Sequence, residues 1–255
     1  MSVPESRRGF LWRGIAAAGG ALLSACDSAS NSTWVPKVLA SGEKVSRSVQ
    51  RAITGRRSMA QEFTEADLSP SFRSNGTYSP EDETYQRLAS NGFREWKLRI
   101  DGQVTTPQEF SLADLRAMNG RTQITRHDCV EGWSAIAKWT GVPLTALLER
   151  VKPLPAARYV VFHCGDPMDE FGTYYYESID LEDAYHPQTI LAYDLNGQAL
   201  PVPNGAPLRA RIERQLGYKQ AKYIMRIELV NSFARINGGK GGYWEDLGYE
   251  WYAGI

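Results

Sequence analysis

The chain is poor in cysteine, has no net charge and shows no internal repeat. Its 255 residues include three cysteines, and Lys plus Arg balance Asp plus Glu at 29 each. Because nucleic-acid-binding domains carry a basic patch or stripe, this balance gives no indication of a nucleic-acid partner. Hydrophobic residues make up 42% of the chain. This composition and length allow one large domain or two small ones.

The N-terminal 26 residues show the pattern of an export signal. Arg7 and Arg8 stand in the motif S-R-R-G-F-L, and a small, apolar run follows from Gly14 to Ala25. This run is too short to cross a bilayer as a stable helix, which is typical of a signal peptide. The arginine pair resembles the twin-arginine signal, whose export route carries folded proteins. An ordinary secretory signal with a chance arginine pair is the alternative.

A candidate lipid-attachment site ends this signal. Residues 23–26 (L-S-A-C) match a bacterial lipobox, in which Cys26 is lipidated and becomes the mature N-terminus. The alternative is a simple cleavage site beside an incidental cysteine. Ser, Asn, Lys and Arg dominate the next stretch, so residues 27–66 are predicted to form a flexible tether before a domain at 67–255. We therefore expect a periplasmic protein, anchored to the membrane if Cys26 is lipidated.

Alternating apolar and polar residues predict a domain rich in strands. Turn signals occur at Asp101-Gly102 and Asn196-Gly197. Helical patterns are short, with a capping-box start at Ser111 and an amphipathic run after Pro143. Strand patterns occur at residues 96–100, 123–126, 159–162, 173–178, 189–194, 198–202, 208–213 and 223–230. Many strands with few short helices predict a mixed α+β fold.

Residues 126–134 (R-H-D-C-V-E-G-W-S) surround one cysteine with ionisable side chains. A neighbouring arginine, or a charged histidine, favours the thiolate, which is the form that attacks or binds metal. Asp128 and Glu131 oppose that effect, so charge alone leaves open whether Cys129 is reactive or structural. A disulfide with Cys164 is a further alternative. However, neither cysteine lies in a Cys-rich pattern, and a chain of this length needs no disulfide.

Together with residues 138–144 (K-W-T-G-V-P-L), this loop resembles the cofactor loop of the sulfite-oxidase-type molybdopterin oxidoreductases. The resemblance is greater to bacterial periplasmic methionine-sulfoxide reductase catalytic subunits than to sulfite oxidase itself. It implies the sulfite-oxidase fold from about Asp67 onward, with mixed sheets and short helices, and a Mo-molybdopterin cofactor. It also implies that Cys129 is the only side chain bonded to molybdenum, a role that suits a soft thiolate. His127 would tune the thiolate or donate a proton, and a structural histidine is the alternative.

Three further segments resemble parts of the family's cofactor site. Residues 204–209 (N-G-A-P-L-R) resemble the pterin-binding run, and residues 217–222 (G-Y-K-Q-A-K) resemble the phosphate loop. The resemblance implies that eight residues contact the cofactor: Asn75, Cys164, Asn204, Arg209, Lys219, Gln220, Ala221 and Lys222. From the residues alone, Arg209 and Lys222 would be solvent-facing strand residues, Asn75 a turn residue and Cys164 a small buried hydrophobe.

The aromatic C-terminal stretch supplies a last candidate. In the family a tyrosine of this stretch lies near the metal, and Tyr249 is the better match, with Tyr252 second. A plain aromatic core contact is the alternative. Residues 238–242 (G-G-K-G-G) lack the Walker spacing and its strand–helix context, so we predict a loop and not a nucleotide site.

The resemblance implies an exported molybdenum enzyme that transfers an oxygen atom and two electrons. Its cysteine loop reads C-V-E-G-W, whereas sulfite oxidases have C-A-G-N-R-R, whose arginines attract sulfite. Reduction of S- or N-oxides such as methionine sulfoxide, free or protein-bound, is therefore favoured. Sulfite oxidation coupled to a cytochrome and a non-catalytic cofactor-binding envelope lipoprotein are alternatives. Without the haem and dimerisation domains of sulfite oxidases, we expect a monomer with a separate electron partner, a membrane haem protein or cytochrome.

The arginine pair can be tested directly. We expect Arg7→Lys/Arg8→Lys to hold the precursor in the cytoplasm, because twin-arginine recognition depends on the guanidinium pair and not on charge alone. Cell fractionation of the wild-type and variant chains measures this. Normal export of the variant would show that another route is used.

Overall fold

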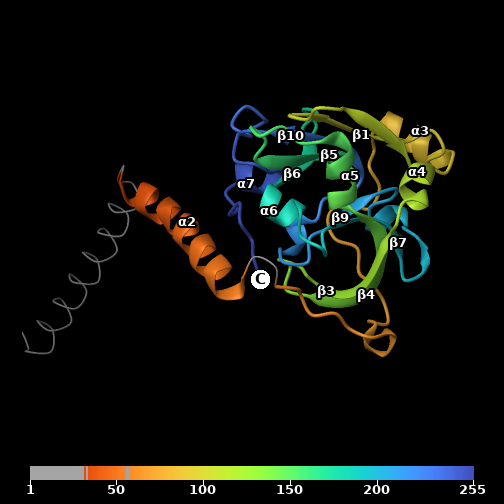
Figure 1. The fold of residues 1–255 in the computed structure, drawn as a ribbon, viewed down its shortest axis with the longest axis horizontal. Helices are drawn as coiled ribbons and strands as arrows, with labels where there is room; N and C mark the ends of the chain where they lie inside the picture. Colours follow the sequence, from red (N-terminus) through yellow and green to blue (C-terminus); the bar gives the residue numbers. More distant parts are fainter. Residues whose placement is uncertain (1–31, 33, 56–57) are drawn as a thin grey trace, which may run out of the picture. The chain divides into compact units, whose positions relative to one another are not determined.

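The protein is described by a computed structural model that covers residue 32, residues 34–55 and residues 58–255 (Figure 1). The chain divides into two compact units between Ile53 and Thr54. None of the described helices has both the length and the apolar content needed to cross a membrane. The export signal predicted at residues 1–26 lies outside the described residues.

The segment predicted as a flexible tether contains a long helix. Helix α2 spans Val35–Thr54. Val45, Val49 and Ile53 recur at every fourth position, the spacing of one helix face. The high Ser and Arg content of the segment conceals this period when only composition is considered. The division of the chain into signal, tether and domain stays a prediction.

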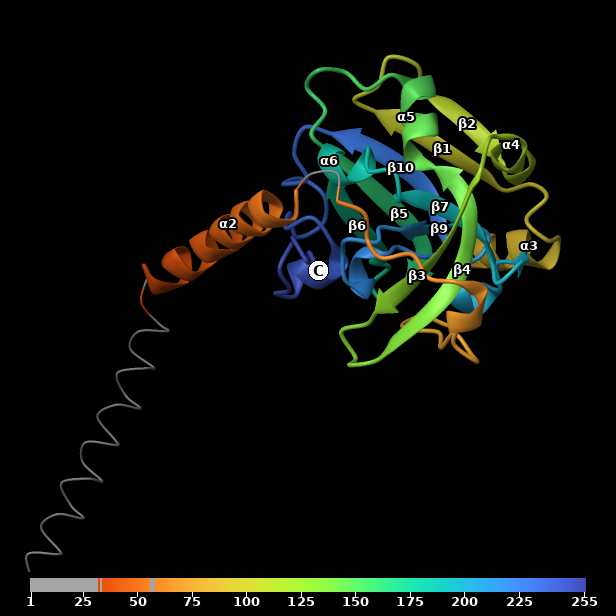
Figure 2. The same cartoon turned by 60° about the horizontal axis from the view of Figure 1, so that its bottom comes forward.

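The domain contains two five-stranded sheets, which confirms the mixed α+β prediction (Figure 2). The first has the order β2-β1-β10-β5-β6, with β1 and β10 parallel and the other pairs antiparallel. Its strands are β1 (Lys97–Gly102), β2 (Gln108–Ser111), β5 (Tyr159–Pro167), β6 (Tyr174–Asp180) and β10 (Ile224–Val230). The second has the order β3-β4-β7-β8, with β9 also paired to β7. Its strands are β3 (Arg121–Asp128), β4 (Ser134–Pro143), β7 (Ile190–Leu195), β8 (Gln198–Ala199) and β9 (Arg209–Arg211).

Short helices precede, connect and follow these strands. They are α3 (Glu83–Ser90), α4 (Leu112–Ala117), α5 (Leu144–Val151), α6 (Leu181–Ala184) and α7 (Tyr243–Asp246), with 3-10 turns at Glu65–Asp67, Val202–Asn204 and Gly217–Lys219. The predicted capping box is present, because the Ser111 hydroxyl accepts from the amide of Asp114, whose carboxylate in turn accepts from the amide of Ser111. Helix α5 buries its apolar face, as its spacing predicted.

The main apolar core joins strands of both sheets. Leu98, Ile100, Phe162 and Leu191 are fully buried, as is Leu147 of α5. Side chains of this kind stabilise a fold by roughly 1.5–3 kcal/mol each when they leave water. The alternation that predicted β1 is confirmed, since Leu98 and Ile100 point inward while Lys97 and Arg99 are exposed. This core fixes the strand ends from which the site is built.

One of the two predicted hairpin turns is present. Asn196 and Gly197 connect β7 to β8, and both have positive φ. At the other site β1 and β2 do form the predicted antiparallel pair, but Asp101 and Gly102 belong to β1 and the connection to β2 lies further on, before Gln108. Gly102 has φ 85, and a Cβ there would lie 2.3 Å from the carbonyl oxygen of Leu229. The glycine therefore permits close packing of β1 against β10.

Candidate functional site

A cavity of about 180 Å³ lies where segments of the two sheets meet. Five residues that the sequence predicted as cofactor or catalytic contacts line it: Asn75, Cys129, Gln220, Lys222 and Tyr249. Its other lining residues are Gly76, Thr77, Val130, Glu131, Asp166, Met168, Tyr175, Gly217, Tyr218 and Trp244. The predicted contacts outside this lining are His127, Cys164, Asn204, Arg209, Lys219 and Ala221.

Cys129 lies in the tight connection between β3 and β4. Its amide donates to the carbonyl of Trp133 at 3.0 Å, and its own carbonyl accepts from the amide of Gly132 at 3.0 Å. Gly132 has φ 84, a left-handed conformation that glycine adopts at little cost. This closed turn places the cysteine at the cavity wall. Cys129 and Cys164 are both free thiols, so the disulfide alternative is wrong.

The cation that acts on Cys129 is not its neighbour in sequence. Burial raises the pKa of the thiol, and the amide and carboxylate of Glu131 have opposite effects on it. Arg73 lowers this pKa, whereas Arg126 is paired with Asp128 at 3.0 Å. Burial outweighs these effects, so the isolated site favours the thiol. A metal ion bound to the sulfur would deprotonate it.

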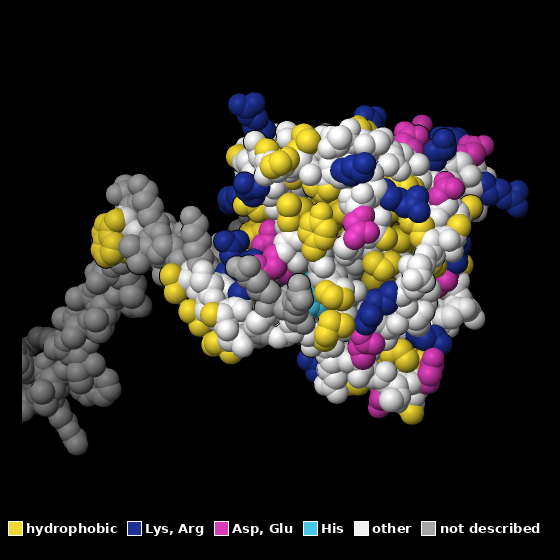
Figure 3. All heavy atoms as spheres, in the orientation of Figure 1, with side chains coloured by type: hydrophobic (Ala, Val, Ile, Leu, Met, Phe, Trp, Pro, Cys, Tyr) yellow, Lys and Arg dark blue, Asp and Glu magenta, His cyan; other side chains and the backbone are white. Residues whose placement is uncertain are grey.

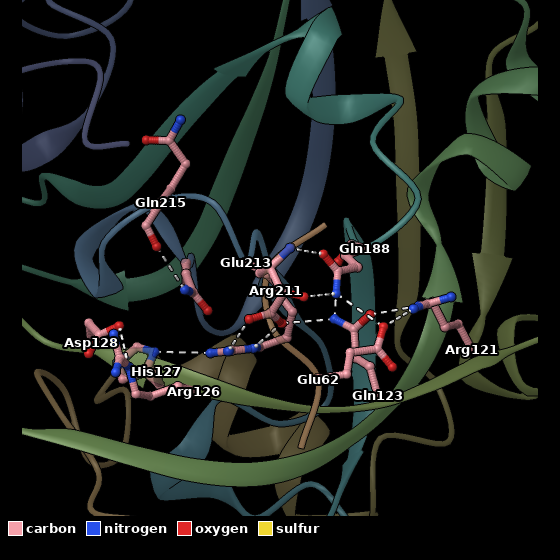
Figure 4. Close-up of polar contacts among 12 residues, drawn as sticks. Glu62, Arg121, Gln123, Arg126, His127, Asp128, Gln188, Arg211, Glu213 and Gln215 are labelled. Carbon is pink, nitrogen blue, oxygen red and sulfur yellow. Dashed lines mark hydrogen bonds and ion pairs between the residues drawn. The ribbon is translucent and has the colours of Figure 1, made fainter. Parts of the chain in front are cut away.

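His127 belongs to a buried polar network and not to the cavity wall. Arg211 Nη1 donates to His127 Nδ1 at 3.0 Å (Figure 4). Burial, and then the charge of Arg211, hold the pKa of His127 well below its usual value. The ring is therefore neutral, with its proton on Nε2, because arginine can only donate. Nε2 faces Gly217, where a Cβ would lie 2.7 Å away.

The same network ties β3 to β9 through residues that the sequence did not single out. Arg211 donates from Nε and Nη2 to the carboxylate of Glu213 at 3.0 and 2.7 Å. Gln123 of β3 donates to the same carboxylate at 2.8 Å. All three side chains are buried, and Figure 4 shows the contacts among them. The alternation of Arg209, Arg211 and Glu213 along the chain gave no sign that these charges face inward.

Arg209 is fully buried, so its solvent-facing alternative is wrong. Its guanidinium lies 5.0 Å from the ring centre of Trp139 and donates to the carbonyl of Asn204 at 2.9 Å. Nε and Nη2 have no partner. Burial, and then the charge of Arg211, lower the pKa of Arg209 to about 9. A buried guanidinium with two vacant donors suits an anionic ligand.

Lys222 holds the loop that carries Asn75. Its ammonium donates to the carbonyls of Asn75, Thr77 and Pro203 at 2.7, 2.5 and 2.9 Å, which uses all three of its protons. Burial, and then the charge of Arg209, lower the pKa of Lys222 to about 7. Lys222 is buried, so the solvent-facing alternative is wrong here too.

Lys219 lies between two buried carboxylates. Its ammonium donates to Glu177 and Glu245 at 2.5 Å each, and all three side chains are fully buried. This ion-pair cluster joins β6 to α7 across the phosphate-loop segment. The charge of Lys219 is thus balanced by carboxylates of the protein itself. The Lys219 ammonium also lies 5.9 Å from the ring centre of Tyr218, a residue of the cavity wall.

Of the four remaining predicted residues, Tyr249 lines the cavity and Asn204, Ala221 and Cys164 do not. Asn204 is buried, and its Nδ2 has no partner. Ala221 is buried and accepts from the amide of Ala210 at 2.8 Å. Cys164 is in the apolar core, which matches its alternative as a small buried hydrophobe. Tyr249 is 44% exposed and packs edge-on against Tyr218, with the two ring centres 5.2 Å apart.

Asp166 is a cavity residue that sequence analysis missed. It is 4% exposed, and its Oδ1 has no partner. Burial raises its pKa to about 6, against the opposing effects of a hydrogen bond from Thr77 and the charge of Lys222. Its position near the end of an apolar strand was a signal, because a carboxylate there must be either paired or functional.

Comparisons with known proteins place these features in a family. Residues 86–235 match the model of the oxidoreductase molybdopterin binding domain. The chain is 36% identical over 249 residues to an Azospira oryzae protein provisionally named protein-methionine-sulfoxide reductase subunit YedZ1, covering 98% of this chain and 88% of that protein. It is 37% identical over 145 residues to the protein-methionine-sulfoxide reductase catalytic subunit MsrP of Ralstonia nicotianae, covering 53% of this chain and 44% of that protein. The crystal structure of sulfane dehydrogenase SoxCD from Paracoccus pantotrophus aligns with TM-score 0.49 and 21% identity, covering 55% of this chain and 39% of that one.

Asp166 should make the stability of the cofactor-free domain depend on pH. Its pKa is about 6 in the fold against an ordinary value of 3.8, so the folded state binds this proton more tightly. The contribution of Asp166 to stability is full below about pH 4 and is lost as pH rises through 6, by on the order of 3 kcal/mol. Asp166→Asn should remove this fall in urea unfolding between pH 4 and 7.

Asp169→Asn is the matched control, because the exposed Asp169 has a lowered pKa, held by hydrogen bonds from Thr173. The Asp169→Asn variant should still lose stability between pH 4 and 7 as the wild type does. Parallel pH profiles for the wild type and Asp166→Asn would contradict the assignment.

Proposed function

The chain belongs to the oxidoreductase molybdopterin binding domain family, of the sulfite-oxidase type, and from this premise we propose that it reduces S- or N-oxides such as methionine sulfoxide. The observation that carries the proposal is the composition of the cavity wall beside Cys129. Val130 and Glu131 follow the cysteine, and Tyr218, Trp244 and Tyr249 lie in the same wall. An apolar and aromatic wall suits a neutral oxide held by packing and a few hydrogen bonds.

The vacant polar atoms around the cavity fit the cofactor that the family implies. Cys129 would hold the molybdenum, and Arg209 would offer its two vacant donors to the phosphate. Single side-chain amide atoms without a partner are Oδ1 of Asn75, Nδ2 of Asn204 and Oε1 of Gln220. When bound, the cofactor supplies the exchange of one oxygen atom and two electrons. The chain supplies the residues that bind the cofactor, the cavity that admits the substrate and the groups that carry protons.

Sulfite fits this wall less well. It is a small anion, and a site for it should present cations beside the metal. Among the described residues that line the cavity, the cationic side chain is Lys222, and its protons are all donated to carbonyls. Arg73 acts on Cys129 but does not belong to the lining. The names of both relatives refer to methionine-sulfoxide reductase, which supports the same choice.

Reduction of an oxide consumes protons as well as electrons. Asp166 lies in the cavity wall, and its pKa of about 6 lets it carry a proton near neutral pH. The word subunit in the names of both relatives supports a separate partner that delivers electrons. We propose a membrane haem protein or a cytochrome in that role, at the periplasmic side of the membrane.

Cys129→Ser tests the metal ligand. The hydroxyl of serine is a poorer ligand than a thiolate for a metal that changes oxidation state. We expect a folded chain that retains pterin but shows no turnover. Metal analysis, pterin fluorescence after extraction and an activity assay on one preparation measure this. Activity above a tenth of the wild-type value would contradict the assignment.

The substrate class needs two steady-state assays on one preparation. With an artificial electron donor, reduction of methionine sulfoxide or a small S- or N-oxide should exceed sulfite oxidation at matched concentrations. The physical reason is the absence, among the described lining residues, of a cation with protons to spare for an anionic substrate. A higher kcat/KM for sulfite with ferricyanide as acceptor would favour the alternative, a sulfite dehydrogenase coupled to a cytochrome.

A further inference from the structure

Helix α2 carries an exposed apolar stripe on one face. Val45, Val49 and Ile53 are 61%, 51% and 80% exposed, and Trp34, just before the helix, is 65% exposed. The three aliphatic residues occupy every fourth position, so they follow one side of the helix for about 12 Å. Figure 3 shows hydrophobic side chains in a row along this helix. Stripes of this kind mark surfaces that bind another phase or another molecule.

Helix α2 is also rich in cations. Over its length the sequence has Lys37, Lys44, Arg47 and Arg51 against one acidic residue, Glu43. Arg47 and Arg51 each stand two positions from Val49, which puts them about 160° from it around the helix axis. From residue 55 onward, by contrast, Asp and Glu outnumber Lys and Arg. Positive charge is therefore concentrated on the helix that carries the apolar stripe.

We propose that α2 lies along the surface of a bilayer with anionic headgroups. The face of Val45, Val49 and Ile53 enters the boundary of the acyl chains, and the cationic side interacts with headgroups and water. A strongly cationic face combined with an apolar face is the pattern of interfacial helices. None of the described helices qualifies as a membrane span, so α2 is placed on the surface and not across it.

Other possible binding partners of α2 would match only one of its two faces. An acidic protein surface would attract the cations and leave the apolar stripe in water. A second copy of α2 would bury a few side chains per partner, well below the roughly 800 Å² that a stable interface buries on each side. Anionic lipid accommodates both faces at once, and each nearby cation adds to the attraction.

The chain joins α2 closely to the domain. Helix α2 ends at Thr54. Ala60 is held by Gln188, which accepts from its amide at 2.7 Å and donates to its carbonyl at 3.0 Å. A helix bound to lipid would therefore keep the domain within a few residues of the bilayer. This inference does not depend on the reaction proposed above.

A polarity-sensitive fluorophore such as nitrobenzoxadiazole can test which face meets lipid. It is attached at Val49→Cys or, in a matched chain, at Arg47→Cys, in the full cofactor-loaded chain carrying Cys26→Ala so that no acyl chain is present. Phosphatidylglycerol vesicles should shift the emission of the probe at position 49 to shorter wavelength and leave the probe at position 47 unchanged. Phosphatidylcholine vesicles should bind roughly tenfold or more weakly.

Three results would overturn the proposal. They are no shift at position 49, equal shifts at both positions, and a shift that grows with protein concentration in the absence of vesicles. The last result would indicate a second copy as the occupant. An interaction with a protein partner would likewise leave position 49 unchanged when pure lipid is added.

A pair of charge-matched variants separates the stripe from simple electrostatics. With the probe at Ile53→Cys, Val45→Asp/Val49→Asp should weaken vesicle binding roughly tenfold or more. Ser46→Asp/Ser48→Asp adds the same charge to exposed positions beside the stripe and should weaken binding less. Circular dichroism confirms that both variants keep the helix. Equal losses in the two variants would show that charge alone drives binding and would overturn the role of the stripe.

Discussion

The incompletely paired guanidinium of Arg209 is the constraint on which the site depends. It is fully buried against Trp139, and two of its donors have no partner. Arg211, two residues further on, is satisfied by Glu213 and His127. A buried cation without an anion is costly to the fold. An anionic group bound against this guanidinium would remove the cost, so cofactor binding and domain stability would be linked.

The site also depends on contacts that bring together three segments far apart in the chain. The turn between β3 and β4 supplies Cys129, β5 supplies Asp166, and the segment before β10 supplies Lys222. Lys222 then fixes the loop of Asn75, which lies 147 positions away in the chain. Each connection is a hydrogen bond to a backbone carbonyl, so the loop position depends little on its own side chains. A rigid wall of this kind keeps the reacting groups in register.

The electrostatics of the wall are the basis of the proposed substrate class. Lys219 is occupied by Glu177 and Glu245, and Lys222 by carbonyls. Cations close to the cavity therefore serve the fold or the cofactor and not a substrate. The carboxyl of Asp166, by contrast, lines the cavity, and burial raises its pKa to about 6. These features support the proposal of neutral, polar substrates that take up a proton.

The sequence by itself determined the strand-rich α+β fold, the amphipathic α5 and the family, because periodicity and motifs are local properties of the chain. It also identified Cys129, Asn75, Gln220, Lys222 and Tyr249, which the structure gathers around one cavity. Only the tertiary structure decided which charges are buried and with what they pair. Arg209 follows the alternation of a surface residue yet is fully buried. Arg126 pairs with Asp128, while the distant Arg73 lowers the pKa of the Cys129 thiol. Lys219 pairs with carboxylates 42 and 26 positions away in the chain. Burial and ion pairing arise from contacts between segments far apart in the chain, and no local pattern encodes them.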